Sequence, residues 1–446
     1  MRNHTTDMTE GNSVRHILIF ALPALIGNIF QQVYNLADSM IVGRFVGADA
    51  LAAVGATSSI TFLFFALCNG IGSGGGIIVS QYYGAHDDDN VRKGIVNTGI
   101  IMLVVPAVIG TIGFISAKGI LNILSTPDEI IADAAMYVRY MCVSIIFVSL
   151  YNYITAMLRA LGDSRSPLYF LILSTIINVF LDILLVYRFE MGIRGAAIAT
   201  IISQFIAAAS CGVYAYHVNP YFKLKKEDIS FVPALAAQVI RLGVPMSLQF
   251  GLIAISAMAV QRIVNAYGTT VVAAFTATNR IEQLIHQPYA TLSTSLATFC
   301  GQNYGARKLN RVNEGYRNGL IIMVCVTALM VITMQFFGGA ITSLFVSEPE
   351  IISLGATGLS ITSIFYLALG LIYVVRGVLT GTGDAFFALF NGVIEVIGRF
   401  TIPILITQYM GMGARGIWLA SGIVWFLSGS TAWLRLKSRS SQILAR

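Results

Sequence analysis

Carboxylate and amide side chains recur at helical spacing inside apolar stretches of this sequence. The first such stretch carries four of them, at intervals of three, four and three residues: Asn28, Gln31, Asn35 and Asp38. In a helix, this spacing places all four side chains on one face. A carboxylate at bilayer depth costs about 2.5–3.5 kcal/mol to insert, so a residue such as Asp38 usually has a function there.

A second polar stripe lies further along the chain, where Ser174, Asn178 and Asp182 are spaced by four residues. Two carboxylates that face each other repel, unless a cation or a proton lies between them. Carboxylate, amide and hydroxyl oxygens are also the ligands of hard cations. Asp38 and Asp182 therefore predict an ion or proton site. The alternative is that local hydrogen bonds neutralise each of them and that both only hold helices together.

The elements that position these residues must be membrane helices. The chain has 446 residues, of which 56% are hydrophobic and 11% charged, and its mean hydropathy is +0.76. Soluble proteins carry about 25% charged residues. We count about twelve stretches of the roughly 20 apolar residues that cross a bilayer. The sequence therefore predicts an all-α polytopic membrane protein with about twelve transmembrane helices.

Lys and Arg concentrate in alternate loops, which predicts that both termini are cytoplasmic. We expect the chain in the plasma (inner) membrane. A net charge of +7 could suggest a nucleic-acid partner. Its distribution over alternate loops instead fits membrane orientation, so we expect no nucleic-acid partner. We expect a monomer in the lipid bilayer.

The chain is duplicated. The stretch that begins GADALAAVGA at Gly47 returns as GTTVVAAFTA at Gly268, and the same offset aligns LRALGD, ending at Asp163, with LTGTGD, ending at Asp384. Each copy holds six spans, which predicts two six-helix lobes related by a pseudo-twofold axis, with a cavity between them. We predict an N-lobe at residues 1–222 and a C-lobe at 223–446, joined by a cytoplasmic linker at about 218–234. At the equivalent positions of the second copy, neither Asp38 nor Asp182 has a carboxylate counterpart, so the fold does not require them.

Several other motifs have structural interpretations. The repeated QYYGA/QNYGA and Gly-Asp sequences fall at span ends, where glycine ends a helix and aspartate can cap the next. Gly70–Gly75 has the spacing of a dinucleotide-binding loop but follows an apolar span, so close helix packing is the better interpretation. His86–Asp89 lies in one solvated loop and does not predict a metal cluster. The five cysteines show no paired spacing. We expect no cofactor.

The second half has polar residues of its own. Asn279, Gln283 and Gln287 share one face of the eighth span, with Glu282 beside them. Together with residues of the first span, they predict the lining of a substrate cavity: Gln31, Tyr34, Asn35, Asn279, Glu282, Gln283 and Gln287. Glu395 and Arg399 are four residues apart, which predicts an ion pair within one helix.

The sequence resembles the MATE (multidrug and toxic compound extrusion) family over nearly its whole length. Four stretches carry the resemblance: YNLADSMIVGRFVGADALAAVGA (Tyr34 to Ala56), LRALGDSRSP (Leu158 to Pro167), NVFLD (Asn178 to Asp182) and GIRGAAIATIISQ (Gly192 to Gln204). The resemblance implies twelve helices in two lobes around a V-shaped cavity. It also implies export of amphipathic and cationic organic compounds in exchange for H⁺ or Na⁺.

Carried over by position, the family's N-lobe cation site corresponds to Asp38, Asn178, Asp182 and Thr200, with Asn152 nearby. Asp38 and Asp182 are then the residues that would hold Na⁺, if Na⁺ is the coupling ion. Pro23 matches a first-helix proline at which some members bend, which implies a hinge. The seventh-helix glutamate of some members is missing from PMSLQFGLIAIS (Pro245 to Ser256), which favours coupling in the N-lobe and the DinF-like branch.

We therefore expect a secondary active multidrug antiporter that works by alternating access. The nearest alternative is a flippase for a lipid-linked oligosaccharide or a related lipid, but such proteins usually have more helices and some have a strongly cationic cavity. An enzyme is not expected, because no Ser/His/Asp or HExxH constellation is present.

Overall fold

The structure is a computed structural model that describes residues 5–46, 48–124 and 126–443. Within these ranges, the side chains of residues 33–45, 48–51, 441 and 442 are not described. The described residues form helices and no strand.

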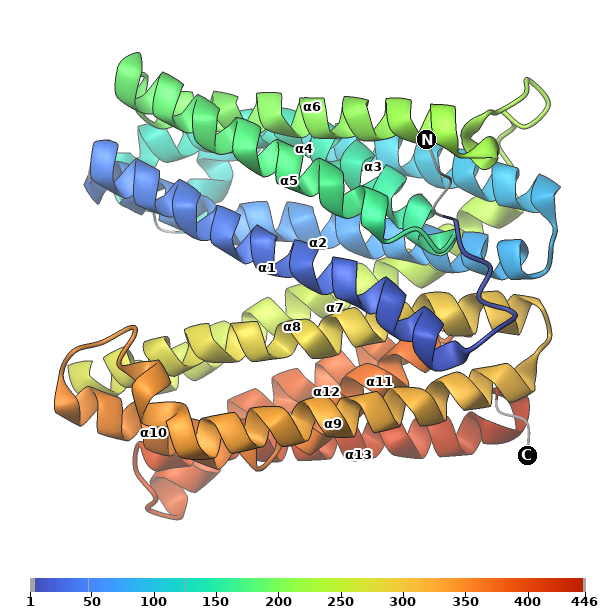
Figure 1. Ribbon diagram of the computed structural model, residues 1–446. Helices are drawn as coiled ribbons and strands as arrows, with labels where there is room; N and C mark the ends of the chain where they lie inside the picture. The colour runs from blue at the N-terminus through green and yellow to red at the C-terminus, as the bar shows by residue number, and fades with distance from the viewer. Residues whose placement is uncertain (1–4, 47, 125, 444–446) are drawn as a thin grey trace. The chain divides into compact units, whose positions relative to one another are not determined.

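The first half of the chain contains six long helices: α1 (Ser13–Phe45), α2 (Ala48–Gly84), α3 (Asp88–Ile123), α4 (Asp128–Ala160), α5 (Arg165–Asp182) and α6 (Gly192–Val218). The second half contains α7 (Pro233–Asn265), α8 (Thr269–Gly305), α9 (Leu309–Thr342), α10 (Pro349–Ser363), α11 (Tyr366–Gly381), α12 (Ala385–Ile404) and α13 (Arg415–Ile443). Two π-helical turns, η1 (Ile183–Arg188) and η3 (Leu405–Tyr409), follow α5 and α12, and a 3-10 turn, η2 (Pro220–Phe222), follows α6. Figure 1 shows the helices.

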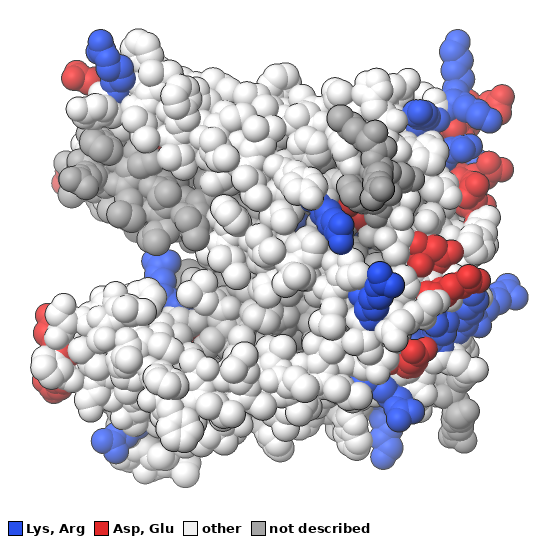
Figure 2. Space-filling view, in the orientation of Figure 1, with Lys and Arg blue, Asp and Glu red and all other residues white. Residues whose placement is uncertain are grey.

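These helices account for the predicted membrane spans. Among the described residues, ten helices are each long and apolar enough to cross a bilayer, and α10 with α11 forms an eleventh span that is bent by 51°. The remaining long helix, α8, has 37 residues but carries the polar residues of the eighth span. In both units of the structure, the charged atoms gather towards the helix ends (Figure 2). The prediction of about twelve transmembrane helices is confirmed.

The packing of the helices divides the chain into two compact units. The N-unit comprises Met1–Asp7 and Leu22–Ser247, and the C-unit comprises Met8–Ala21 and Leu248–Arg446. The predicted lobes, residues 1–222 and 223–446, follow the repeat in the sequence. The units differ from them at two segments, because the start of α1 packs in the C-unit and the start of α7 packs in the N-unit.

The two units share one packing plan. In the N-unit, α4 packs against α2, α3 and α6, and α5 packs against α6. In the C-unit, α11 packs against α8, α9 and α13, and α12 packs against α13. The repeat offset relates these pairs to each other, with α10 and α11 together in the place of α4.

The repeated motifs end helices as predicted, with two differences. The helices α2 and α8 end at Gly84 and Gly305, but the residues with left-handed backbone are His86 (φ 56°) and Arg307 (φ 57°). Asp163 caps α5 by accepting hydrogen bonds from the backbone N–H groups of the next helix, both at 3.0 Å. Asp384 does not cap α12, because its carboxylate instead accepts a hydrogen bond from Arg435 Nε at 2.9 Å.

The linker is held by side chains of α3. The Asn97 amide accepts a hydrogen bond from the Val232 N–H at 2.8 Å and donates one to the Ser230 carbonyl at 3.0 Å. The Tyr221 hydroxyl donates to an Asp88 carboxylate oxygen at 2.7 Å. Burial of Tyr221, together with this carboxylate, raises the pKa of its phenol.

Candidate functional site

Helix α5 has a polar face inside and an apolar face outside. Its buried residues are Ser166, Pro167, Ser174, Asn178 and Asp182. On the opposite face, Ile176 and Phe180 are each 62% exposed. An apolar outer face suits lipid, whereas polar residues buried in a membrane helix usually mark an ion or substrate pathway. The stripe predicted from spacing therefore points into the N-unit.

A cavity of about 270 Å³ opens beside this stripe, and its lining comes from α1, α2, α4, α5 and α6. Its hydroxyl and amide residues are Gln31, Thr61, Ser144, Asn152, Ser174, Thr200 and Gln204. Four aromatic residues also line it: Phe64, Phe65, Tyr137 and Tyr151. The described lining residues are all uncharged. Such a cavity can bind an amphipathic molecule through aromatic contacts and a few hydrogen bonds.

The structure brings three of the predicted site residues to this cavity: Gln31, Asn152 and Thr200. The Asn152 amide donates to the Val148 carbonyl at 2.8 Å, and the Thr200 hydroxyl donates to the Ala196 carbonyl at 3.0 Å. Both side chains are thus held by their own helices while they face the cavity.

Asn178 and Asp182 are not among the lining residues of this cavity and lie further along the face of α5 that carries Ser174. Both have an exposed fraction of 0%. The amide oxygen and nitrogen of Asn178 have no hydrogen-bond partner among the described residues. Most buried polar side chains have a hydrogen-bond partner, so this amide is open to a partner that the described residues do not supply. The Ser174 hydroxyl donates to the Ser203 carbonyl at 3.2 Å and so ties this face of α5 to α6.

Three predicted site residues, Tyr34, Asn35 and Asp38, have side chains outside the described part of the structure. Asp38 and Asp182 therefore remain a predicted pair. Pro23, the predicted hinge, lies inside α1.

Sequence reasoning missed the contribution of α2 to the cavity and, apart from Asn152, that of α4; the missed polar and aromatic residues are Thr61, Phe64, Phe65, Tyr137, Ser144 and Tyr151. Two of these, Thr61 and Ser144, are polar residues inside apolar spans, so the signal that identified Asn152 was present for them too. The aromatic residues carried no such signal, because aromatic side chains also pack helices together.

The C-unit fills the equivalent positions with charged and large side chains. The repeat offset replaces Thr61, Phe65, Asn152, Ser174, Asn178 and Gln204 with Glu282, His286, Tyr373, Glu395, Arg399 and Trp425. His286 Nδ1 lies 3.2 Å from the Tyr373 hydroxyl, and its ring lies 5.7 Å from that of Trp425. The two units thus share a fold, but the positions that line the N-unit cavity, and the position of Asn178, have different chemistry in the C-unit.

The predicted ion pair between Glu395 and Arg399 is wrong. Glu395 instead pairs with Arg376 of α11, whose Nη2 lies 3.7 Å from its Oε1. Arg376 also donates to the Asn391 amide oxygen at 3.3 Å and lies 5.3 Å from the centre of the Tyr373 ring. The Gln249 amide, with its oxygen turned to the guanidinium, accepts from it at 2.9–3.1 Å. A neighbouring helix thus offers Glu395 a closer cation than its own helix does.

The polar residues of α8 divide between two directions. Asn279 and Gln283 are exposed, and Gln287 is half-buried and donates from its amide to the Gln283 carbonyl at 3.0 Å. Glu282 is half-buried, and one of its carboxylate oxygens is enclosed in the C-unit without a hydrogen-bond partner among the described residues. Glu282 is therefore more buried than Asn279 and Gln283, which are predicted cavity residues of the same helix.

Comparison with known proteins gives one family. A family model described as MatE matches residues 23–184 and again residues 245–406. The chain is 30% identical over 436 residues to the probable multidrug resistance protein YpnP of Bacillus subtilis (strain 168), covering 96% of each chain. It is 29% identical to the probable multidrug resistance protein YoeA of the same organism, over 91% of this chain and 89% of the relative. A crystal structure of MATE in the bent conformation superimposes with a TM-score of 0.93 at 21% identity, covering 99% of each chain.

Proposed function

Because the chain belongs to the MATE family and is a multi-pass membrane transporter rather than an enzyme, we propose that it is a multidrug antiporter. It exports amphipathic and cationic organic compounds in exchange for H⁺ or Na⁺ by alternating access. The observation that carries this proposal is the buried polar face of α5, which ends at Asp182 and passes an uncharged, aromatic cavity.

The coupling ion binds in the N-unit, at Asp38 and Asp182, with Asn178, Thr200 and Asn152 nearby. A buried carboxylate holds a proton or a cation more stably than it holds a bare charge. Asn178 supports this site, because its buried amide has no partner among the described residues. The C-unit suits the role less well, since Arg376 already neutralises Glu395 there.

The cavity suits the substrate. Its four aromatic rings offer large apolar faces, and aromatic rings attract cations by about 0.5–2 kcal/mol each. A lipid pyrophosphate would require fixed positive charge, which the described lining does not offer. The flippase alternative is therefore not favoured.

The direction of transport follows from the membrane potential. One positive charge that moves inward through 100 mV releases about 2.3 kcal/mol. When the ion enters the N-unit from outside, its binding favours release of the substrate to that side. When the ion then leaves to the cytoplasmic side, the carboxylates can accept another ion.

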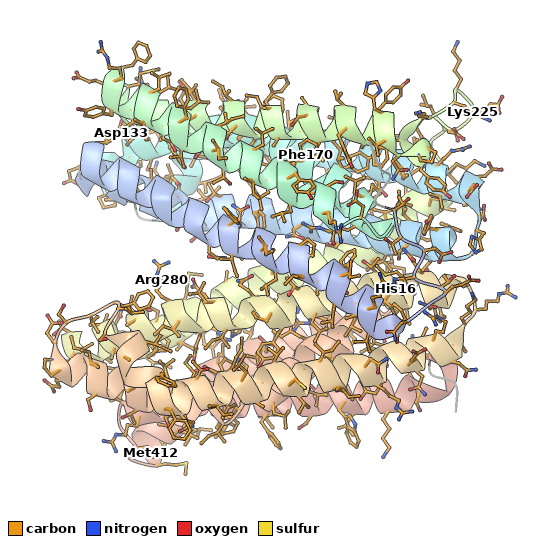
Figure 3. All side chains as sticks on the ribbon, viewed as in Figure 1. His16, Asp133, Phe170, Lys225, Arg280 and Met412 are labelled. Atoms are coloured by element: carbon orange, nitrogen blue, oxygen red, sulfur yellow. The ribbon has the colours of Figure 1, made fainter. Side chains whose placement is uncertain are left out.

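We expect proteoliposomes to move a lipophilic cationic dye such as ethidium against its gradient when a pH or sodium gradient is imposed. The two gradients are applied separately, which identifies the coupling ion. The control is Asp133→Asn. This carboxylate of α4 is exposed and does not line the cavity, and it lies at the opposite end of the N-unit from Lys225 (Figure 3). Its replacement should therefore leave transport unchanged. Dye movement at the same rate with no gradient, or movement of a labelled lipid instead, would contradict the proposal.

A further inference from the structure

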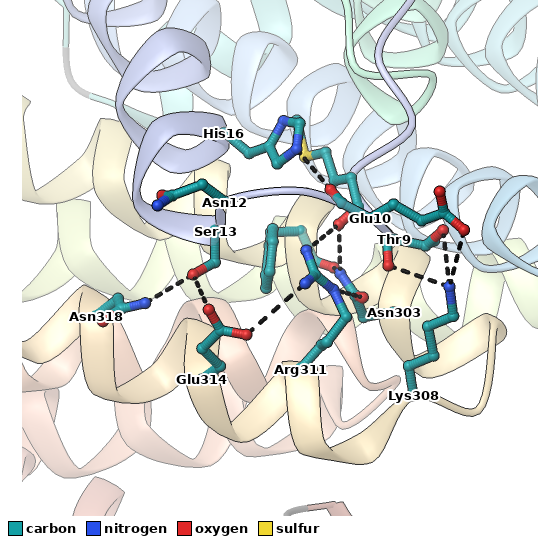
Figure 4. A network of polar contacts seen from close by, with 12 residues as sticks. Thr9, Glu10, Asn12, Ser13, His16, Asn303, Lys308, Arg311, Glu314 and Asn318 are labelled. Carbon is teal, nitrogen blue, oxygen red and sulfur yellow. Dashed lines mark hydrogen bonds and ion pairs between the residues drawn. The ribbon is translucent and has the colours of Figure 1, made fainter.

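The C-unit carries two clusters of charged side chains at the end where α8 is followed by α9 and where α13 ends (Figure 1). The first cluster surrounds the start of α1 (Figure 4). In it, Lys308 Nζ lies 3.8 Å from Glu10 Oε1, and Arg311 Nη1 lies 3.8 Å from Glu314 Oε2. The Ser13 hydroxyl also donates to Glu314 Oε1 at 2.6 Å. Two cations thus meet two carboxylates, so the attachment of this part of the chain accounts for the whole cluster.

The second cluster is not balanced in charge. Arg435 Nε and Arg439 Nε lie 2.9 and 3.6 Å from the same oxygen, Asp384 Oδ2. We call Arg435 and Arg439 the arginine pair. Asp384 is the only carboxylate within 4.0 Å of either guanidinium among the described residues, so one positive charge is unmatched. The Asp384 side chain is 4% exposed, whereas those of the pair are 35% and 39% exposed. A buried carboxylate therefore holds two accessible guanidinium groups side by side.

The fold does not require the arginine pair. The repeat offset replaces its two members with Tyr214 and Val218 in the N-unit. There, Asp163 caps α5 by accepting two backbone hydrogen bonds. Its counterpart Asp384 makes no such bond to α12 and orients the pair instead. One arginine would be enough to neutralise this carboxylate, so the second arginine indicates a function beyond the fold.

The chemistry of the arginine pair suits a phosphate group. A guanidinium presents its N–H donors in a planar fork that matches the oxygens of a phosphate. Each arginine turns its Nε to Asp384, and the terminal Nη nitrogens make no hydrogen bond to another described residue. The start of α12, which has no side-chain cap, adds the positive end of a helix dipole. The pair can therefore bind an anion that offers several oxygens.

The surroundings favour the phosphate of a lipid over a free phosphate ion. Phe386 and Leu434 lie within two residues of the cluster along the chain and are 67% and 56% exposed. The cluster also lies where the membrane span Ala385–Tyr409 begins and the span Arg415–Ser440 ends. This position corresponds to the depth of lipid headgroups. Anionic lipids attract basic residues at the cytoplasmic surface, which is the side that the loop charges predict for this end.

We propose that the arginine pair binds the phosphate of an anionic phospholipid at the cytoplasmic end of the C-unit. The acyl chains of the lipid lie against the exposed side chains of Phe386 and Leu434. This lipid is a fixed partner of the protein and not a transported compound. The inference goes beyond the proposed transport function and does not depend on it, because lipid binding requires neither a coupling ion nor a drug.

The test is thermal unfolding of the whole chain in a neutral detergent, titrated with short-chain phosphatidylglycerol, short-chain phosphatidylcholine or inorganic phosphate. A ligand that binds only the folded protein raises its unfolding temperature. We expect phosphatidylglycerol to raise that temperature by about 2 °C or more, and the other two compounds to raise it less. An equal shift with inorganic phosphate would show that the pair binds any phosphate, and an equal shift with phosphatidylcholine would show no preference for an anionic lipid. Either result would overturn the proposal.

Arg439→Gln removes one guanidinium but leaves Arg435 to neutralise Asp384. We expect the phosphatidylglycerol concentration that gives half of the shift to rise by about fivefold or more in this variant. The matched control is Lys437→Gln, which removes the same charge from the same turn of α13. The Lys437 ammonium lies 5.1 Å from the centre of the Trp433 ring and makes no ion pair with a described residue. Equal weakening in both variants, or unchanged binding in Arg439→Gln, would contradict the proposal.

A second variant tests the other member of the pair. Arg435→Gln combined with Asp384→Asn removes this guanidinium together with the carboxylate that it neutralises, so no buried charge is left unpaired. Phosphatidylglycerol binding should weaken by a similar factor, about fivefold or more. Binding at the affinity of the wild type in this double variant would also contradict the proposal.

Discussion

Asp182→Asn is expected to abolish ion-coupled transport while leaving the fold intact. The side chain is fully buried at the end of the polar face of α5, and asparagine matches its size but cannot carry a proton or neutralise a cation. Removal of a residue that only hydrogen-bonds the ligands of a metal ion already lowers metal affinity or activity by about 10–100-fold. We therefore expect dye transport under either gradient to fall by at least tenfold, and Asp38→Asn to behave alike.

The control for this variant is again Asp133→Asn, measured at equal protein density in the vesicles. The thermal unfolding of Asp182→Asn in detergent should remain close to that of the wild type, because the amide keeps the packing of α5 against α6. If Asp182→Asn transports normally, Asp182 only holds helices together, which is the alternative that the sequence left open.

Arg376→Met is expected to have the largest effect on stability. This guanidinium is the ion-pair partner of Glu395 and also contacts Gln249, Asn391 and Tyr373. Its removal leaves a carboxylate that is 7% exposed without a counter-charge. Breaking a buried pair in this way costs about 3–5 kcal/mol. The measurement is thermal or denaturant unfolding of the purified protein in detergent.

The double variant Arg376→Met with Glu395→Gln separates the charge from the packing. Removing both charges avoids the buried, unpaired carboxylate, so most of the lost stability should return. Arg280→Met, at an exposed position of α8, serves as the control and should have little effect. Equal destabilisation in the single and double variants would show that Arg376 acts through packing and not through Glu395.

The sequence predicted the fold because membrane helices must satisfy all their backbone hydrogen bonds internally, so apolar length alone identifies most of them. It predicted the polar face of α5 for a related reason, since Ser174, Asn178 and Asp182 can only point inward from an otherwise apolar helix. The alignment of the two halves located the carboxylates that the fold does not require. Assignment to the DinF-like branch stays a prediction.

Three features depended on contacts between distant residues and were not predictable from local pattern. Glu395 pairs with a cation of α11 rather than with its neighbour on α12, and Asp384 binds Arg435 rather than the helix that it precedes. The packing of the start of α1 in the C-unit and of the start of α7 in the N-unit was also missed, because an apolar helix start carries no local signal of the unit in which it packs.

The most direct test of the central claim is to let the substrate drive the ion. Proteoliposomes are loaded with a cationic dye at equal pH and equal sodium on both sides, and then diluted into dye-free buffer while the internal pH and sodium are followed. The account predicts that dye efflux draws H⁺ or Na⁺ inward in the wild type and in Asp133→Asn, but not in Asp182→Asn. Dye efflux with no ion movement in the wild type, or unchanged ion movement in Asp182→Asn, would contradict it.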